Sequence, residues 1–226
     1  MRMSRRMGLL GGKKLVLPTL AELFADMTVI NQKGRDSSNS GTLSMSVNIE
    51  TNPSIYVFAF CNDSFAIHHL LSNGSEYGKT TLYRATDDSN ATNIYISGTS
   101  CYLSTNGSSS AKVYGGTIIA ATFPSYTDEQ ISAVFSNISV KNSAGRNSSS
   151  ASTISLSNTV ITGEIILTAC SGAMCVAPVA SPTKYIRTLD FSYGGVRNRV
   201  TGDKIYLALT GASSSTRVNG GTILTI

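Results

Sequence analysis

The chain contains no tryptophan, only two histidines and few charged residues. Lys, Arg, Asp and Glu together make up 14% of its 226 residues, well below the usual share of about 25%. Because 41% of the residues are hydrophobic, the chain can still build a substantial core, which excludes disorder as its main state. Serine and threonine supply about a quarter of the residues, so the polar surface is built from hydroxyl and amide groups rather than ions.

Long hydrophobic runs are also missing. No stretch approaches the roughly 18 uninterrupted apolar residues of a membrane-spanning helix, which argues against an integral membrane protein built from helices. The basic start resembles a signal peptide, but Gly11, Gly12, Lys13 and Lys14 interrupt its short apolar stretch, so we expect no export signal. The four cysteines are then expected to be reduced, buried thiols, because their spacing fits neither a zinc site nor a redox motif.

Residues that could carry chemistry are scarce. The sequence patterns typical of serine hydrolases, zinc proteases and nucleotide-binding loops do not occur. His68 and His69 are adjacent, so on a strand they point to opposite faces, which argues against a shared metal ion. Asp128 and Glu129 fall in the first turn of an expected helix, where the helix macrodipole accounts for them. We therefore expect no catalytic residue, cofactor, metal or small-molecule substrate, and predict that the protein is not an enzyme.

The sequence repeats itself. Residues 108–119 align with residues 213–224 at eight of twelve positions, and residues 34–46 align with residues 145–157 in the same order. The Gly-Gly pair in the first alignment lies between strand-like residues rather than before a helix, which predicts a bulge or tight turn and not a phosphate-binding loop. The chain is therefore predicted to be a tandem duplication.

Each copy is expected to begin with a short helix, at roughly residues 20–27 and 128–135. In both places a threonine stands three residues before a partner, Glu22 or Gln130, that completes a capping box. Alternating apolar and polar residues then predict strands. The expected strands are residues 42–49, 55–60, 82–84, 94–96, 101–103, 112–114 and 117–121 in the first copy, and residues 153–157, 165–169, 185–191, 204–209 and 222–226 in the second.

About seven short strands in roughly 100 residues predict an antiparallel β-sandwich. The expected fold class is all-β, with two tandem duplicated immunoglobulin-like sandwiches, each preceded by a short helix. The expected units are a basic N-terminal arm at residues 1–14, the first repeat at residues 15–123 and the second at residues 124–226. The core is predicted to contain Leu43, Met45, Val47, Ile55, Val57, Cys61, Ile118, Ile154, Leu156, Ile166, Cys170 and Ile223, because alternation places them on one face of their strands.

The net charge of +5 is confined to the start of the chain. Residues 1–14 hold five bases and no acid, and the remaining thirteen bases balance thirteen acids. We interpret this segment as an extended docking arm, in which glycines let the backbone bend and approach a neighbouring subunit closely. Its partner-binding residues are predicted to be Arg2, Met3, Arg5, Arg6, Met7, Leu9, Leu10, Lys13 and Lys14. Plain disorder of this segment is the main alternative. Binding to nucleic acid is less favoured, because the arm has no aromatic residue for base stacking, and a membrane anchor would need more apolar residues.

A basic, methionine-rich start followed by duplicated β domains, poor in charge and rich in Ser, Thr and Asn, resembles the structural proteins of tailed bacteriophage virions. These include decoration proteins, head-tail adaptors and tail components with immunoglobulin-like modules. The resemblance is one of composition and organisation over the whole chain. It implies assembly in the host bacterial cytoplasm, a homo-oligomer within the virion, no cofactor, and function through contacts with other virion proteins at the head, neck or tail. A secreted or surface-exposed adhesin built from β repeats is the alternative.

Overall fold

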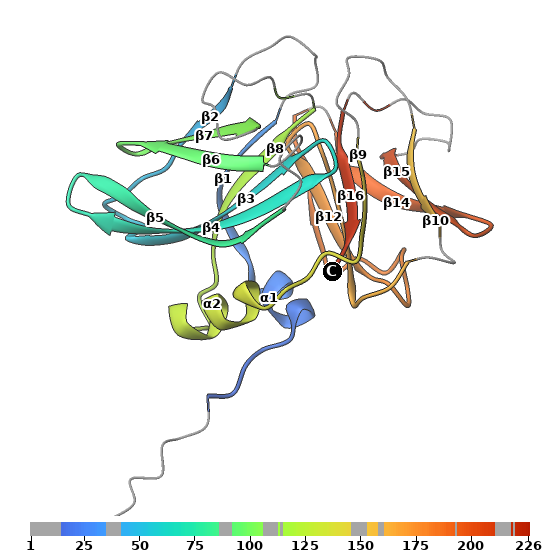
Figure 1. The fold of residues 1–226 in the computed structure, drawn as a ribbon, viewed down its shortest axis with the longest axis horizontal. Helices are drawn as coiled ribbons and strands as arrows, with labels where there is room; N and C mark the ends of the chain where they lie inside the picture. Colours follow the sequence, from blue (N-terminus) through green and yellow to red (C-terminus); the bar gives the residue numbers. More distant parts are fainter. Residues whose placement is uncertain are drawn as a thin grey trace, which may run out of the picture.

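The computed structural model describes residues 15–34, 42–85, 92–105, 113, 115–145, 153–157, 161–192, 194–210, 218 and 220–226. Within these residues the chain forms two antiparallel β-sandwiches that lie side by side, with two short helices below the first of them (Figure 1). The first repeat contains α1 (Leu20–Asp26), β1 (Thr28–Gly34), β2 (Leu43–Ser46), β3 (Ser54–Cys61), β4 (Ser64–Asn73), β5 (Glu76–Arg84), β6 (Thr92–Ser97), β7 (Ser100–Thr105) and β8 (Thr117–Thr122).

The second repeat has the same elements in the same order. It contains α2 (Asp128–Ser136), β9 (Asn142–Gly145), β10 (Ile154–Ser157), β11 (Ile165–Cys170), β12 (Ala173–Pro178), β13 (Arg187–Leu189), β14 (Val196–Thr201), β15 (Lys204–Leu209) and β16 (Thr222–Thr225). Both helices begin with the predicted capping boxes, at Thr19 with Glu22 and at Thr127 with Gln130. These side chains satisfy backbone N–H groups that have no partner inside the helix.

Sheet topology confirms the duplication. The first repeat pairs its strands in the orders β1-β8-β3-β4-β5 and β2-β7-β6, and the second repeats both orders as β9-β16-β11-β12-β13 and β10-β15-β14. Thr117 and Thr222, aligned in the sequence, begin the equivalent strands β8 and β16. The strand order differs from that of an immunoglobulin constant-type domain, whose sheets hold strands A-B-E-D and C-F-G. Here the first and last strands pair, and so do the second and second-last.

Several strands have no counterpart among the predicted ones. β4 and β12 are buried along most of their length on both faces, so they lack the alternation that was used to find strands. β1 and β9 are half-exposed edge strands, and β14 has three consecutive polar residues, 197–199, so it shows no alternation of apolar and polar residues. β13 is shorter than the expected strand at residues 185–191. The strand expected at residues 112–114 lies outside the described residues except for Val113, which is buried.

The predicted core residues are all buried, and they divide into two sandwich interiors. One lies between the sheets of the first repeat and contains Leu43, Met45, Val47, Ile55, Val57, Cys61 and Ile118. The other lies in the second repeat and contains Ile154, Leu156, Ile166, Cys170 and Ile223. Alternation therefore identified the inward face of each predicted strand correctly.

A third and larger core joins the two repeats. It uses the outer faces of the five-stranded sheets, including Phe58 and Ile119 from the first repeat and Leu167 and Leu224 from the second, together with both helices. This explains why β3 and β11 are hydrophobic at almost every position, since both faces of each strand are buried.

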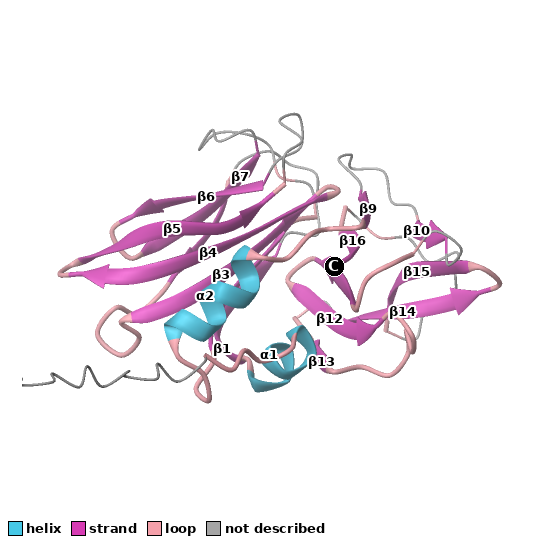
Figure 2. Ribbon diagram, turned by 60° about the horizontal axis from the view of Figure 1, so that its bottom comes forward, coloured by secondary structure: helices cyan, strands magenta, loops and turns pink. Residues whose placement is uncertain are grey.

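Helix α2 belongs to the second repeat in sequence but packs against the five-stranded sheet of the first (Figure 2). Its Phe135 lies 5.5 Å from Phe58 of β3 between ring centroids, in an edge-to-face arrangement. The two repeats thus share a core as well as a sequence pattern.

The repeats face one another through reciprocal contacts. Gly34 at the end of β1 lies against the backbone of residues 171–172, the turn between β11 and β12. Gly145 at the end of β9 lies against residues 62–63, the equivalent turn of the first repeat. Each repeat therefore offers the same strand end and the same turn to the other, which is the pattern of an interface with approximate two-fold symmetry.

Hydrogen bonds follow the same symmetry. The backbone N–H of Gly172 donates to Oγ1 of Thr117 at 3.0 Å, and Oγ1 of Thr222 donates to the carbonyl of Asn62 at 2.6 Å. Asn62 and Ser171, the equivalent first residues of the two turns, both have left-handed backbone conformations with φ of 56° and 53°. The aligned Gly-Gly pairs form turns that lead into β8 and β16, as predicted, with positive φ at Gly115, Gly220 and Gly221.

Candidate docking surface

The predicted partner-binding residues, from Arg2 to Lys14, all lie outside the described residues. The described chain begins at Leu15, and the three residues from Leu15 to Leu17 expose large apolar side chains, with Val16 77% exposed. The chain is fixed near this point because Nε2 of Gln130, in the first turn of α2, donates to the carbonyl of Val16 at 2.8 Å. Residues 1–14 therefore join the folded body beside the helices.

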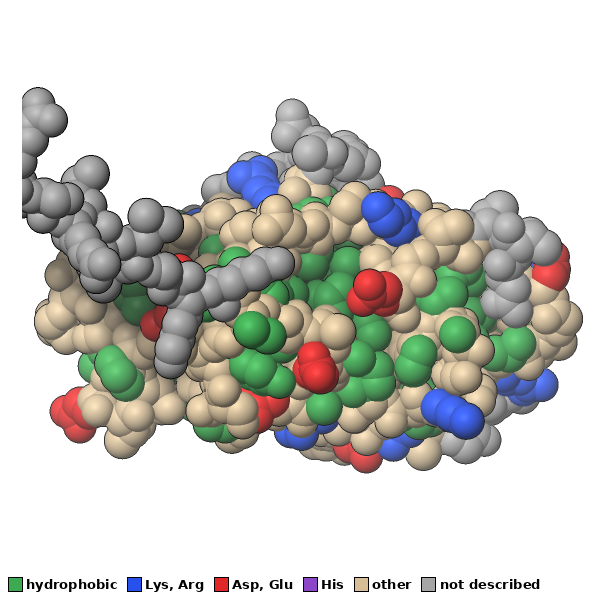
Figure 3. Space-filling view, turned by 90° about the horizontal axis from the view of Figure 1, so that it is seen from below, with side chains coloured by type: hydrophobic (Ala, Val, Ile, Leu, Met, Phe, Trp, Pro, Cys, Tyr) green, Lys and Arg blue, Asp and Glu red, His purple; other side chains and the backbone are tan. Residues whose placement is uncertain are grey.

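The face that carries the helices is apolar and acidic. The helices contribute four acids, Glu22, Asp26, Asp128 and Glu129, and no lysine or arginine. Figure 3, which views the molecule from this side, shows hydrophobic side chains with acidic side chains among them and several lysine or arginine side chains around them.

A groove on this face runs between the start of the chain, the C-terminal half of α2 and the C-terminus. It is lined mainly by Leu17, Leu20, Val134, Ile138 and Ile226, with Glu164 and Lys141 at its polar margin. We refer to this groove and the acids of the two helices as the helical base. The acids of the two helices are opposite in charge to residues 1–14, and the side chains that line the groove are apolar, as are the methionines and leucines of that segment.

Sequence analysis did not detect a polar cluster that joins α2 to the first repeat. The hydroxyl of Ser54 donates to Asp128 at 3.0 Å and lies 2.8 Å from Nε2 of His69. The hydroxyl of Tyr56 donates to the same carboxylate at 2.8 Å, and the Tyr56 and His69 rings stack with centroids 4.3 Å apart. These residues come from β3, β4 and α2, up to 74 positions apart in the sequence, so no local pattern reveals them.

The Ser54, His69 and Asp128 cluster is not arranged as a catalytic triad. In a triad the carboxylate binds Nδ1 of histidine while the serine binds Nε2. Here Asp128 and Ser54 both approach Nε2 of His69, at 3.6 Å and 2.8 Å. Burial lowers the pKa of His69, an effect that the nearby carboxylate of Asp128 partly offsets. The contacts instead hold the start of α2 against the first sheet.

His68 points to the opposite face of β4, as expected for adjacent residues of a strand, and closes one edge of the first sandwich. Its Nε2 accepts from the backbone N–H of Ile94 at 3.3 Å, so Nδ1 is the nitrogen that donates to Oγ1 of Thr81, at 3.0 Å. Lys79 donates to the carbonyl of the same Ile94 at 2.7 Å. His68 of β4 and Lys79 of β5 thus bind the backbone N–H and the carbonyl of Ile94 on the edge strand β6. These contacts keep another strand from pairing with β6 at this residue.

The buried histidine predicts that stability falls in mild acid. Burial, followed by the charges of Lys79 and Arg84, lowers the pKa of His68 to about 3. Because the unfolded chain takes up this proton near pH 6.5, acid favours the unfolded state throughout the interval between the two values. We expect the free energy of unfolding to fall by about 2 kcal/mol between pH 7 and pH 5.

Urea unfolding of the parent protein and of His68→Gln at these two pH values provides the measurement. The variant should be less stable at pH 7 and clearly less sensitive to pH. An equal loss of stability in both proteins would show that His68 is not the group that titrates.

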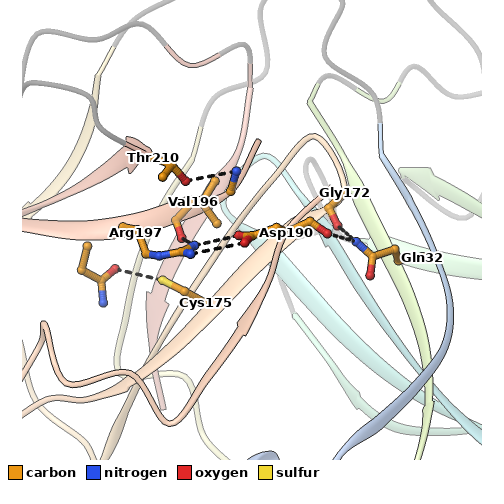
Figure 4. A network of polar contacts seen from close by, with 9 residues as sticks. Gln32, Gly172, Cys175, Asp190, Val196, Arg197 and Thr210 are labelled. Atoms are coloured by element: carbon orange, nitrogen blue, oxygen red, sulfur yellow. Dashed lines mark hydrogen bonds and ion pairs between the residues drawn. The ribbon is translucent and has the colours of Figure 1, made fainter. Parts of the chain in front are cut away.

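Gln32 makes a further contact between the repeats (Figure 4). From β1 it donates through Nε2 to the carbonyl oxygens of Gly172 and Asp190, at 3.1 Å and 2.8 Å. The Asp190 carboxylate accepts from Nη1 of Arg197 at 2.9 Å, a hydrogen bond that raises the pKa of Arg197. An exposed ion pair of this kind contributes at most about 1 kcal/mol, so the backbone contacts of Gln32 are the more specific link.

The cysteines lie in the described part of the chain, and each is a buried thiol outside any disulfide. Burial raises the pKa of Cys101 and of Cys175 to about 12, which keeps these two thiols protonated and unreactive at neutral pH. Among the described residues, no three His, Cys, Asp or Glu side chains gather in a way that could hold a metal ion. Neither described helix is long enough to cross a membrane.

Comparison with protein-family models, with curated proteins and with solved structures finds no match to this chain.

Proposed function

We propose that this protein is a structural component of a tailed bacteriophage virion and works by assembly with other capsid, neck or tail subunits. In this proposal it is made and assembled in the host bacterial cytoplasm, and residues 1–14 dock on a neighbouring subunit. The observation that carries the proposal is the shared core, which joins two similar sandwiches that follow a basic segment, residues 1–14. A body of this kind suits a component that must present two similar surfaces at a fixed spacing.

The polar chemistry of the molecule also supports an assembly role. The polar groups around Asp128 and His68 are engaged in holding strands and helices together. The chain has few charges outside residues 1–14, and hydrogen-bonded interfaces between uncharged hydroxyl and amide groups are little affected by salt. An adhesin with β repeats is the competing proposal, and it places the protein on the cell surface rather than in particles.

Deletion of residues 2–14 tests the proposal. We expect the deleted protein to enter particles far less than the full chain while its melting temperature hardly changes, because the core clusters draw on residues from Leu20 onward. Incorporation is measured by quantifying the protein in purified particles of its source, and stability by thermal melting of the free protein.

A matched control replaces residues 2–14 with a Gly/Ser sequence of equal length, and it should fail to incorporate as the deletion does. Normal incorporation of the deleted protein would remove the docking role of the arm. A large fall in its melting temperature would make the segment part of the fold instead. Absence of the full chain from particles, with recovery at the cell surface, would support the adhesin.

A further inference from the structure

We propose that the docking site for residues 1–14 is the helical base of a second copy of this chain, so that two copies exchange arms. This inference rests on the proposed function and names the surface that the arm would use. The helical base has an apolar groove and an excess of acids, whereas the arm has five bases, no acid, and Met3, Met7, Leu9 and Leu10 as apolar residues. The two surfaces are therefore complementary in both charge and polarity.

The direction of the chain favours a neighbour over the same molecule. Between Leu20 and Val16 the chain passes along the groove toward the first turn of α2, where Gln130 fixes the carbonyl of Val16. The rest of the groove, near Ile138 and Ile226, lies along the other end of α2. The described residues between Leu20 and Val16 thus lead away from this end of α2, and residues 1–14 would have to reverse that direction to enter the groove of their own molecule.

The length of the arm is sufficient for exchange between molecules. Fourteen residues in extended form reach about 46–50 Å. Gly8, Gly11 and Gly12 permit close approach of the backbone to the groove. Because the arm leaves the body beside the same surface that it would bind on the neighbour, two copies can exchange arms about a two-fold axis, which closes the assembly as a dimer.

The test uses the full chain with charge-reversed variants. The arm variant carries Arg5→Glu and Arg6→Glu. The base variant carries Glu129→Lys and Glu164→Lys, two exposed acids on the helical base and at the margin of its groove. The control carries Glu76→Lys and Asp203→Lys, exposed acids in the β4–β5 and β14–β15 turn regions, and changes the net charge as much as the base variant does. Sedimentation velocity over a wide range of concentration measures self-association, and thermal melting verifies that each variant is folded.

We expect the parent protein and the control to associate, more weakly as salt is added. The arm variant and the base variant should each associate at least about tenfold more weakly. An equimolar mixture of these two variants should associate again, because the basic arm of the base variant meets the intact base of the arm variant.

Three results would overturn the inference: a parent protein that stays monomeric at every concentration, a base variant that associates as the parent does, or a mixture that does not recover. If the parent stays monomeric while deletion of the arm still prevents incorporation into particles, the arm binds a different virion protein. In that case the proposed function stands and this inference fails. If association follows the expected pattern but the chain is absent from particles, the proposed function fails alone.

Discussion

Replacing Gly145 by alanine should destabilise the entire protein by more than about 3 kcal/mol, and Gly34→Ala should have the same effect. A methyl group on Gly145 would overlap the backbone of Asn62 and Asp63, and one on Gly34 would overlap Ser171 and Gly172. In both cases the obstacle is the backbone of the other repeat rather than a movable side chain. Relief requires the repeats to separate, which disrupts the hydrogen bonds of Thr117 and Thr222 at the same interface.

Gly78→Ala is the matched control for these substitutions. Gly78 lies in β5 with an ordinary backbone conformation, and the nearest atom to an added methyl group would be the carbonyl oxygen of Leu71 at 3.8 Å. Its replacement should change the free energy of unfolding by less than about 1 kcal/mol. Chemical denaturation of the three variants measures the effects. Gly34→Ala or Gly145→Ala with the stability of Gly78→Ala would mean that the repeats do not meet through these turns.

The reciprocal contacts explain why a duplicated sandwich gains from being one chain. In a symmetric dimer a surface patch binds its own equivalent on the partner, and here the strand end and turn of one repeat bind the turn and strand end of the other. Because the partner is covalently attached, association is intramolecular and requires no minimum protein concentration. The outer faces of the two five-stranded sheets are buried where the repeats pack together. The helical base and the outward surfaces of the sandwiches are therefore left for contact with other molecules.

Alternation in the sequence predicted the two sandwich interiors but not the core between them. Leu43 and Leu156 belong to strands with one buried and one exposed face. In such strands every second residue is apolar, so the sequence identifies the buried face directly. Residues 56–61 are all apolar and residues 165–170 are apolar except for Thr168, which indicates that both faces are buried but does not identify what covers them. That cover comes from the other repeat and the helices, which are distant in the sequence: Phe135 of α2 contacts Phe58 of β3 from 77 positions away. Local pattern carries no information about it.

The same limit applies to the polar residues of the candidate surface. The capping threonines were predictable because their partners lie three residues away. The meeting of His69 with Asp128, and the burial of His68 against Ile94, depend on how α2 and β6 pack, and neither has a sequence signature. Gly34 and Gly145 are aligned between the two repeats, and each is followed by an arginine. Their role required the structure, because close backbone approach is one of several reasons for glycine at such a position.

Leu156→Asp should unfold the protein as a whole and not the second repeat alone. Leu156 is 5% exposed and faces the interior of the second sandwich, opposite Ile205 of β15 in the sheet register. A carboxylate there would be buried among apolar side chains with no partner, at a cost of more than about 4 kcal/mol. Ser155→Asp is the matched control, because Ser155 lies on the exposed face of the same strand and should tolerate the charge.

Whether unfolding spreads from the second repeat to the first depends on the third core, which the two repeats share. Ile223 lies with Leu156 in the interior of the second sandwich. The next residue of the same strand β16, Leu224, packs in the third core with Phe58 of β3 and Phe135 of α2. Loss of the second sandwich would therefore expose the outer face of β3, and the first repeat should lose its stability in the same transition. Hydrogen exchange measures this directly: β3 and β11 should lose protection together in Leu156→Asp. If β3 stayed protected while β11 exchanged, the repeats would be independent folding units, and the shared core would contribute little to their cooperativity.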